Sequence, residues 1–133
     1  MILVDSSVWI DYFRDRTTVH TQQLDEWLDQ GTQDVGVADL VVFEVLRGFR
    51  DDHASRQAQA FFGELQTVTI GGMDNALQAA QLYRRLRALG RTVHSPIDVL
   101  LASYCMAHGH TLLHSDADFE SLKVLGGLET WPH

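Results

Sequence analysis

Four carboxylates from distant parts of the chain stand where side chains of parallel α/β proteins form sites. Asp5 follows the apolar run 2–4, and Asp116 lies just beyond the apolar run 111–113. Glu44 lies about one turn inside a predicted helix, and Asp98 lies in the first turn of another. Strand ends and the helix starts that follow them share one edge of a parallel sheet, so we expect these four side chains to converge.

Such a cluster is suited to a divalent cation. Four bare carboxylates at close range repel one another, and some would have to stay protonated. Mg²⁺ removes that difficulty, because it binds carboxylate oxygens and keeps water ligands for a phosphate substrate. Two such ions about 4 Å apart can activate an attacking water and stabilise the leaving oxygen of a phosphodiester. The residue types therefore favour metal-assisted phosphodiester hydrolysis.

Each of these residues also has a structural interpretation when it is taken alone. Asp98 stands three residues after Ser95, and Asp118 stands three residues after Ser115, so both pairs fit a capping box at a helix start. Glu44 lies in an almost wholly apolar segment, where a charge needs a partner and Arg47 is close enough to supply one. Asp5 has no Lys or Arg among residues 6–13. Only the four together favour a metal site.

The elements that would position these residues alternate between short strands and helices. We predict strands over 2–4, 35–38, 67–70, 111–113 and 128–131. We predict helices after Ser6 or Ser7 through 13, over about 19–30, after Asp39 to near Gly48, over about 53–65 and 74–89, from 96 onward and from 115. Ser6 or Ser7, Asp39 and Ser95 are the predicted caps, with Pro96 at the first helical position. This alternation predicts an α/β protein, namely a single-domain α/β/α sandwich over residues 1–133 with a short parallel sheet.

The composition excludes several classes of protein. With 45% hydrophobic and 21% charged residues, the 133-residue chain is typical of one globular domain rather than a disordered protein. A single cysteine, Cys105, excludes a disulfide framework and is expected to pack as a small apolar residue. No apolar run is long enough to cross a bilayer, and the start does not resemble a signal peptide. We therefore expect a cytoplasmic protein with no membrane partner.

The charge balance is acidic. Ten Lys and Arg face 18 Asp and Glu, which gives a net charge of −8 and excludes a global basic surface for nucleic acid. Nine of the ten basic residues are Arg, and the one basic cluster is Arg84, Arg85, Arg87 and Arg91. The cluster is interpreted first as a solvated helix end stabilised by the macrodipole, and the alternatives are a contact with phosphate or with a protein partner.

Two other groups of side chains have more than one interpretation. His108 and His110 precede the predicted strand 111–113 and His114 follows it, so they lie at opposite sheet edges and should not share a metal. His94 and His114 lie near the acidic edge and are candidates for substrate contact. The aromatic residues Phe43, Phe49, Phe61 and Phe62 fit core packing or an interface with a second protein.

Four blocks of the sequence resemble, in order, those of PIN-domain proteins, specifically VapC-type toxins of bacterial toxin–antitoxin pairs. The blocks are residues 2–13 (ILVDSSVWIDYF), 44–48 (EVLRG), 95–102 (SPIDVLLA) and 112–119 (LLHSDADF). The resemblance implies an acidic site of Asp5, Glu44, Asp98 and Asp116 holding Mg²⁺ or Mn²⁺, with Asp118 as an auxiliary ligand. Ser6, Arg47 and His114 are candidates for substrate binding, although many relatives have Ser or Thr in place of His114.

The same resemblance implies a function and partners. The expected activity is endoribonuclease cleavage of structured RNA, commonly tRNA, by metal-assisted attack of water. The expected partners are a second copy of the chain and a VapB-type antitoxin whose tail blocks the site. The alternatives are a non-catalytic PIN-fold binding module and a receiver-like phosphoacceptor. The latter needs a lysine after a late strand, for which Lys123 is the one candidate, and adjacent acids after the first strand, where Ser6 follows Asp5.

Overall fold

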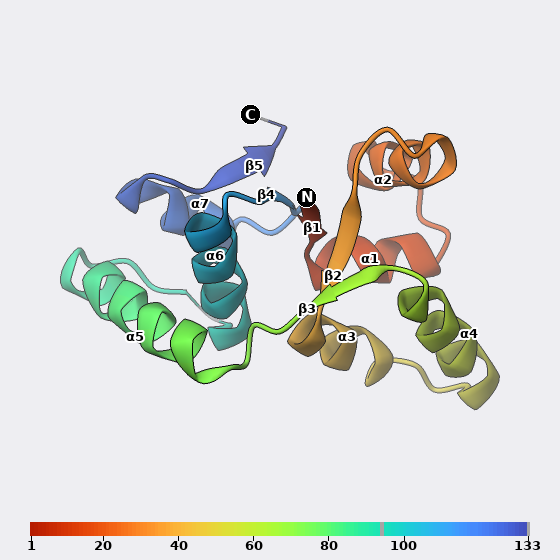
Figure 1. Cartoon of the computed structure of the whole chain (residues 1–133), viewed down its shortest axis with the longest axis horizontal. Helices are drawn as coiled ribbons and strands as arrows, with labels where there is room; N and C mark the ends of the chain where they lie inside the picture. Colours follow the sequence, from red (N-terminus) through yellow and green to blue (C-terminus); the bar gives the residue numbers. More distant parts are fainter. Residues whose placement is uncertain (94, 133) are drawn as a thin grey trace.

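The computed structural model describes residues 1–93 and 95–132. Five parallel strands form one sheet in the order β3-β2-β1-β4-β5 (Figure 1). The strands are β1 (Ile2–Val4), β2 (Val35–Ala38), β3 (Gln66–Val68), β4 (Thr111–Leu113) and β5 (Glu129–Trp131). The helices are α1 (Ser6–Phe13), α2 (Val19–Gln30), α3 (Asp39–Leu46), α4 (Asp52–Gly63), α5 (Met73–Ala88), α6 (Pro96–His108) and α7 (Asp118–Leu122), followed by the short 3₁₀ helix Lys123–Leu125.

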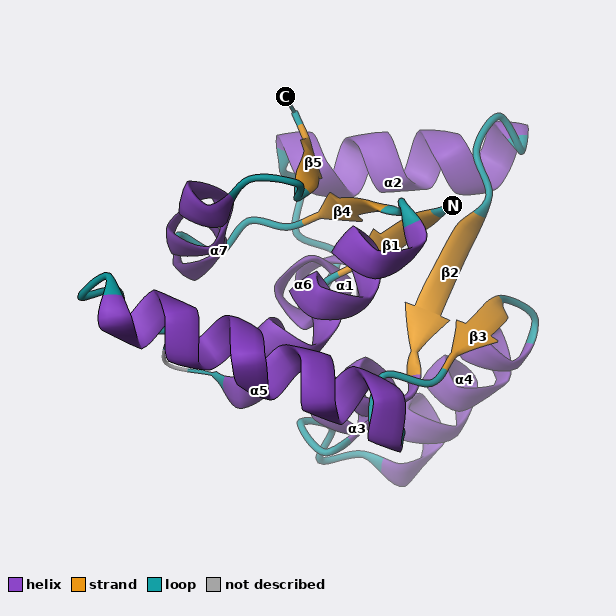
Figure 2. Cartoon of the chain, turned by 60° about the vertical axis from the view of Figure 1, so that its left-hand side comes forward, coloured by secondary structure: helices purple, strands orange, loops and turns teal. Residues whose placement is uncertain are grey.

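The helices cover the sheet on both faces, which confirms the predicted α/β/α sandwich. Helices α1 to α4 lie on one side of the sheet and α5 to α7 on the other (Figures 1 and 2). The chain proceeds outward from β1 to β2 and β3, then returns past β1 to β4 and β5. The strand order therefore reverses between β1 and β4, and ligands of doubly wound sheets bind at such a reversal, beyond the carboxyl ends of the strands.

The three central strands have the predicted bounds because their residues are apolar and have no exposed face. All of β1 and β2 is buried, and Leu3 pairs with Gly36 on one side and with Leu112 on the other. Trp9 of α1 is completely buried and packs edge-on against Phe62 with 5.2 Å between ring centroids. Cys105 is 1% exposed within the core, as the sequence predicts.

Two helix starts differ from the predicted capping. Asp5, rather than Ser6 or Ser7, caps α1, because its carboxylate accepts the backbone N–H of Ser7 at 3.1 Å. Asp39 does not cap α3; its carboxylate instead accepts the N–H of Ile70 at 2.8 Å, across 31 residues. That bond holds Ile70 outside β3, which spans 66–68 instead of the predicted 67–70.

The start of α7 is also corrected. The helix begins at Asp118 instead of Ser115, because the Asp116 carboxylate accepts the backbone N–H of Asp118 at 3.0 Å. The predicted capping box between Ser115 and Asp118 is not present, and the Ser115 hydroxyl donates to the Ser7 hydroxyl at 3.2 Å. At α6, Ser95 and Pro96 take the predicted positions, but the Ser95 side chain makes no capping bond.

Smaller differences concern the ends of two helices and one strand. Helix α4 spans 52–63 instead of 53–65, α5 spans 73–88 instead of 74–89, and β5 begins at 129 instead of 128. Within the described residues, no helix has the length and apolar character needed to cross a membrane.

Candidate active site

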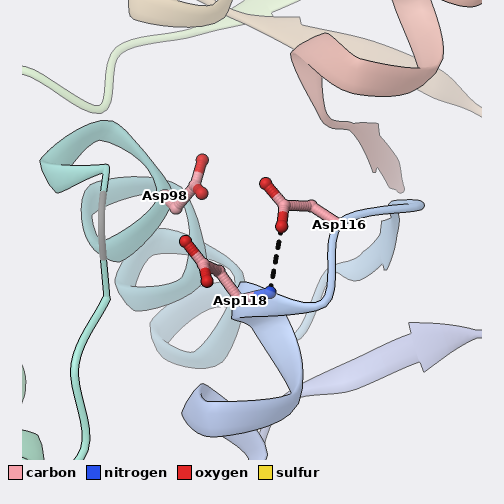
Figure 3. Close-up of side chains that lie close together, drawn as sticks. All are labelled: Asp98, Asp116 and Asp118. Carbon is pink, nitrogen blue, oxygen red and sulfur yellow. Dashed lines mark hydrogen bonds between the residues drawn. The ribbon is translucent and has the colours of Figure 1, made fainter.

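Three carboxylates meet where α6 begins and α7 begins. Asp98 comes from the first turn of α6, Asp116 from the segment that joins β4 to α7, and Asp118 is the first residue of α7 (Figure 3). One oxygen of each lies within 4.8 Å of the other two. The backbone N–H of Asp118 donates to the Asp116 carboxylate, which fixes these two residues relative to each other. This spacing is suitable for three oxygen ligands of one cation.

Asp98 is buried among the other carboxylates of the site. Its side chain is 4% exposed, and its pKa is raised to about 8. Burial is the largest cause, and the charges of Asp5, Asp116, Glu44 and Asp118 add to it in that order. The four other carboxylates therefore act on Asp98, which shows that all five form one electrostatic unit. We call these five residues the acidic cluster.

Asp5 joins the cluster from the end of β1. One carboxylate oxygen accepts both the Ser7 hydroxyl, at 2.6 Å, and the Ser7 backbone N–H. The other oxygen, Oδ1, is buried and has no hydrogen-bond partner among the described residues. Burial raises the pKa of Asp5, the bonds from Ser7 and Ser6 lower it, and the charge of Asp116 adds a smaller increase. An unpaired buried carboxylate oxygen is costly unless a cation binds it.

Glu44 enters from α3 and carries a second such oxygen. Its Oε1 is buried and has no partner among the described residues. Burial raises the pKa of Glu44, and the Asp5 charge raises it further, whereas a hydrogen bond from Ser6 and the charge of Arg47 lower it. Arg47 forms no ion pair with Glu44 in the described chain; its guanidinium lies over the Phe43 ring, 5.4 Å from the centroid.

The donor set of the acidic cluster fits a hard divalent cation. It offers carboxylate oxygens only, and two of them are buried with no hydrogen-bond partner in the described part of the chain. The pKa of three of its members is raised. Mg²⁺ and Mn²⁺ prefer such oxygen ligands, and their charge would favour the ionised form of every member.

The structure differs from the sequence prediction in how centrally Asp118 and Asp5 lie in the site. Asp118 lies within the compact triad with Asp98 and Asp116, while Asp5 acts on that triad from the end of β1. Ser7, which holds Asp5, was not among the predicted site residues. The signal for it was the Asp-Ser-Ser order at 5–7, because an Asp N-cap bonds the residue two positions later.

His114 lies beside the acidic cluster. Its ring is 8% exposed and packs on Phe119 with 4.7 Å between centroids, and burial lowers its pKa. It lines a pocket of about 300 Å³ that also includes Asp116 and Trp131. His108 and His110 lie beyond the opposite end of β4, as predicted, and His94 lies outside the described residues.

Lys123, the candidate for the lysine of a receiver-like phosphoacceptor, forms an ion pair with Glu120. Lys123 follows α7 and its ammonium lies 3.6 Å from the carboxylate of Glu120 on the same helix. It makes no ion pair with a member of the acidic cluster within the described residues. This geometry gives the phosphoacceptor alternative no support.

Comparison with known proteins agrees with this geometry. The PIN domain model matches residues 2–125, nearly the whole chain. The chain belongs to the PIN domain family. Ribonuclease VapC11 of Mycobacterium tuberculosis and a VapC ribonuclease of Mycobacterium bovis are each 28% identical to this PIN domain over 129 residues, which cover 97% of this chain and 96% of theirs.

Solved structures share the fold at lower identity. VapBC2 from Rickettsia felis, bound to a DNA fragment from its promoter, matches with a TM-score of 0.77 at 15% identity, covering 98% of this chain and 97% of that one. DNA-bound VapBC from Salmonella typhimurium matches with a TM-score of 0.77 at 16% identity, covering 97% and 95%. These likenesses confirm the PIN-like architecture of this chain.

Proposed function

We propose that this PIN domain is a divalent-metal-dependent endoribonuclease that acts as the toxin of a VapBC-type toxin–antitoxin pair. The observation that carries the proposal is the acidic cluster at the reversal of strand order between β1 and β4. The VapC ribonucleases that resemble the chain over nearly its whole length support the ribonuclease class. The proposed substrate is structured RNA, tRNA in particular.

The acidic cluster would hold the metal. Asp98, Asp116 and Asp118 are the proposed ligands of a Mg²⁺ ion, for which Mn²⁺ can substitute, and Asp5 and Glu44 complete the site directly or through water. When bound, the metal supplies an acidified water and offsets negative charge at the phosphodiester. No side chain then needs to act as a general base.

The remaining residues of the chain orient the ligands and the substrate. Ser7 holds one carboxylate oxygen of Asp5, and the other oxygen is buried with no hydrogen-bond partner among the described residues. Ser6, Arg47 and His114 are proposed to contact RNA: Ser6 and Arg47 stand beside Glu44, and His114 lines the pocket that includes Asp116. The lowered pKa of His114 keeps its ring neutral near pH 7, which suits a hydrogen bond to a base or sugar.

The proposed protein partners are a VapB-type antitoxin and a second copy of the chain. The solved neighbours include VapBC complexes, and the net charge of −8 suits a basic antitoxin tail entering the acidic cluster. The second copy is supported by Phe43 on α3 and by Met73 and Leu77 on α5, whose side chains are exposed although apolar.

The direct test is cleavage of a structured RNA pool by the purified protein, with Mg²⁺ and with EDTA. We expect cleavage with the metal and none with the chelator, and loss of cleavage in Asp98→Asn. Cleavage that survives both EDTA and Asp98→Asn would overturn the proposal. A folded, metal-loaded protein that leaves all RNA intact would leave the non-catalytic binding module as the function.

A further inference from the structure

The basic cluster noted in the sequence is a surface patch on one end of α5. Arg84, Arg85 and Arg87 lie in the last turns of α5, Arg91 lies in the segment that follows, and all four are exposed. We call these four residues the arginine patch. It gathers four of the ten basic residues of a chain whose net charge is −8. It is thus a local reversal of the surface charge.

The patch has no acidic partner within the described chain. The ion pairs there join Arg16 to Asp11 and Lys123 to Glu120, and neither involves the patch. Arg84, Arg85 and Arg87 line a shallow hollow of about 630 Å³, and Arg87 lies over the Tyr83 ring, 5.9 Å from its centroid. Like charges that lie close together without a counter-charge repel one another. The binding of an anion there relieves this repulsion and is therefore favourable.

Helix stability alone does not explain the patch. The macrodipole favours cations in the last turn, which holds Arg85 and Arg87, but its effect is small beyond that turn, where Arg84 and Arg91 lie. All four residues of the patch are arginines, as are nine of the ten basic residues of the chain. Arginine offers a planar fork of donors that matches the oxygens of a phosphate.

The packing of α5 directs the patch away from the core. Leu82 and Leu86 are buried, and Asn75 at the other end of the helix donates to the backbone oxygens of Ile70 and Leu100. These contacts anchor α5 along α6 and leave the arginines on its outer surface. The patch is therefore preformed on a rigid helix.

The position of α5 relates the patch to the acidic cluster. The C-terminal end of α5 lies on the same side of the molecule as α7 in both views (Figures 1 and 2). Arg85 lines a hollow together with Met106 and Ala107 from the last turn of α6, whereas Asp98 lies in the first turn of that helix. The patch therefore lies toward the opposite end of α6 from Asp98, and only an extended polyanion can contact both the patch and the acidic cluster.

We propose that the arginine patch binds the sugar–phosphate backbone of the RNA substrate at a distance from the scissile bond. The inference rests on the proposed ribonuclease function and adds the residues that hold the substrate. An acidic surface repels RNA in general, so a local patch of arginines determines where RNA can be held. The contacts are to phosphates and carry no base specificity.

The test compares two double variants with equal charge changes. Arg84→Gln/Arg85→Gln removes half of the patch, and Arg50→Gln/Arg56→Gln removes two exposed arginines in and before α4. RNA binding is measured over a range of salt concentrations in the Asp98→Asn background, which prevents cleavage. We expect the patch variant to bind about tenfold or more weakly, with a salt slope lower by about 2, and the control to change little.

Cleavage by the otherwise wild-type enzyme supplies the second measurement. The patch variant should raise KM and leave kcat unchanged, because it loses binding without touching the reacting atoms. Arg91 lies outside the helix, and Arg91→Gln should raise KM by a smaller factor without changing kcat. This variant allows the test to be made even if the double variant is unstable. Unchanged RNA affinity and KM in both variants would overturn this inference and leave the proposed function intact.

Two further outcomes also decide the question. If the patch variants lose binding to an acidic peptide but not to RNA, the patch is a protein-docking site and the inference is wrong. If RNA binding in the Asp98→Asn background depends on the patch while wild-type protein cleaves nothing, the patch inference stands and the ribonuclease proposal fails.

Discussion

The acidic cluster and the arginine patch both hold like charges close together, but the protein surrounds them in opposite ways. Asp98 is 4% exposed and its pKa is raised to about 8, so burial and its neighbours keep the metal-free cluster partly protonated. The four arginines are exposed, where water and salt screen their repulsion. The buried charges are therefore suited to a tightly bound cation, and the exposed ones to a salt-sensitive contact with a polyanion.

The largest expected effect on RNA cleavage comes from removing a carboxylate from the buried acidic cluster. Asp98→Asn should lower RNA cleavage by more than about 100-fold, because it removes a proposed metal ligand at the point where the other carboxylates act. Glu120→Gln is the matched control, since Glu120 lies on α7 but pairs with Lys123. Initial rates of cleavage at saturating Mg²⁺ measure both. Equal rates for the two variants would contradict the assignment.

A smaller loss is expected when the support of a ligand is removed. Ser7→Ala deletes the hydroxyl that donates to Asp5 at 2.6 Å and leaves the backbone bond in place. Cleavage should fall about tenfold, with a matching rise in the Mg²⁺ concentration needed for half-maximal rate. Ser115→Ala, which removes a hydroxyl one contact further away, should have a weaker effect. A loss of rate with unchanged metal dependence would show that Ser7 does not position a metal ligand.

The raised pKa of Asp98 predicts how the stability of the metal-free protein depends on pH. The folded state holds a proton that the unfolded state releases near pH 4, so the stabilisation is complete below that pH and is lost as the pH rises toward about 8. The slope for this group approaches about 1.4 kcal/mol per pH unit between these limits. Urea unfolding in EDTA at several pH values measures it.

Asp98→Asn is the matched variant for that slope. Asparagine does not titrate, so the variant should unfold with a shallower dependence on pH than the wild type. Saturating Mg²⁺ should flatten the wild-type slope in the same pH range, since it favours the ionised cluster. A wild-type slope that neither change reduces would place the titrating group elsewhere in the molecule.

The smallest expected effect concerns the exposed side of the comparison. Raising salt from about 50 to about 200 mM should increase KM for RNA and leave kcat nearly constant, because salt weakens phosphate contacts and not a buried metal site. Steady-state cleavage at several salt concentrations measures the two constants. A fall in kcat with constant KM would reverse the roles given to the two regions.

Local sequence was sufficient to predict most of the sheet and four of the five clustered carboxylates. Strands β1, β2 and β4 are short and mostly apolar, so their bounds could be predicted from residue type. Asp5 follows β1 directly, and Asp116 is the third residue after β4. Because parallel strands end at one edge, their convergence with Glu44 and Asp98 follows from the fold class.

The remaining features depend on contacts that a local pattern does not contain. Asp39 bonds Ile70 across 31 residues, which ends β3 early. The Asp116 carboxylate, rather than Ser115, accepts the backbone N–H of Asp118 where α7 begins. Asp118 then lies in the triad with Asp98 and Asp116. That the arginine patch forms no ion pair with any described residue depends on which side chains the folded protein brings near it. Tertiary geometry decides each of these.

We propose that the acidic cluster binds a divalent cation, which would be the catalytic metal. Calorimetric titration of the metal-free protein with Mn²⁺ at pH 7, in buffers of different ionisation enthalpy, tests it most directly. The account predicts saturable binding with release of protons, because ligands must ionise to bind metal and Asp98 is protonated at that pH. It also predicts loss of this binding in Asp98→Asn. No binding at millimolar Mn²⁺, or equal binding by the variant, would contradict it.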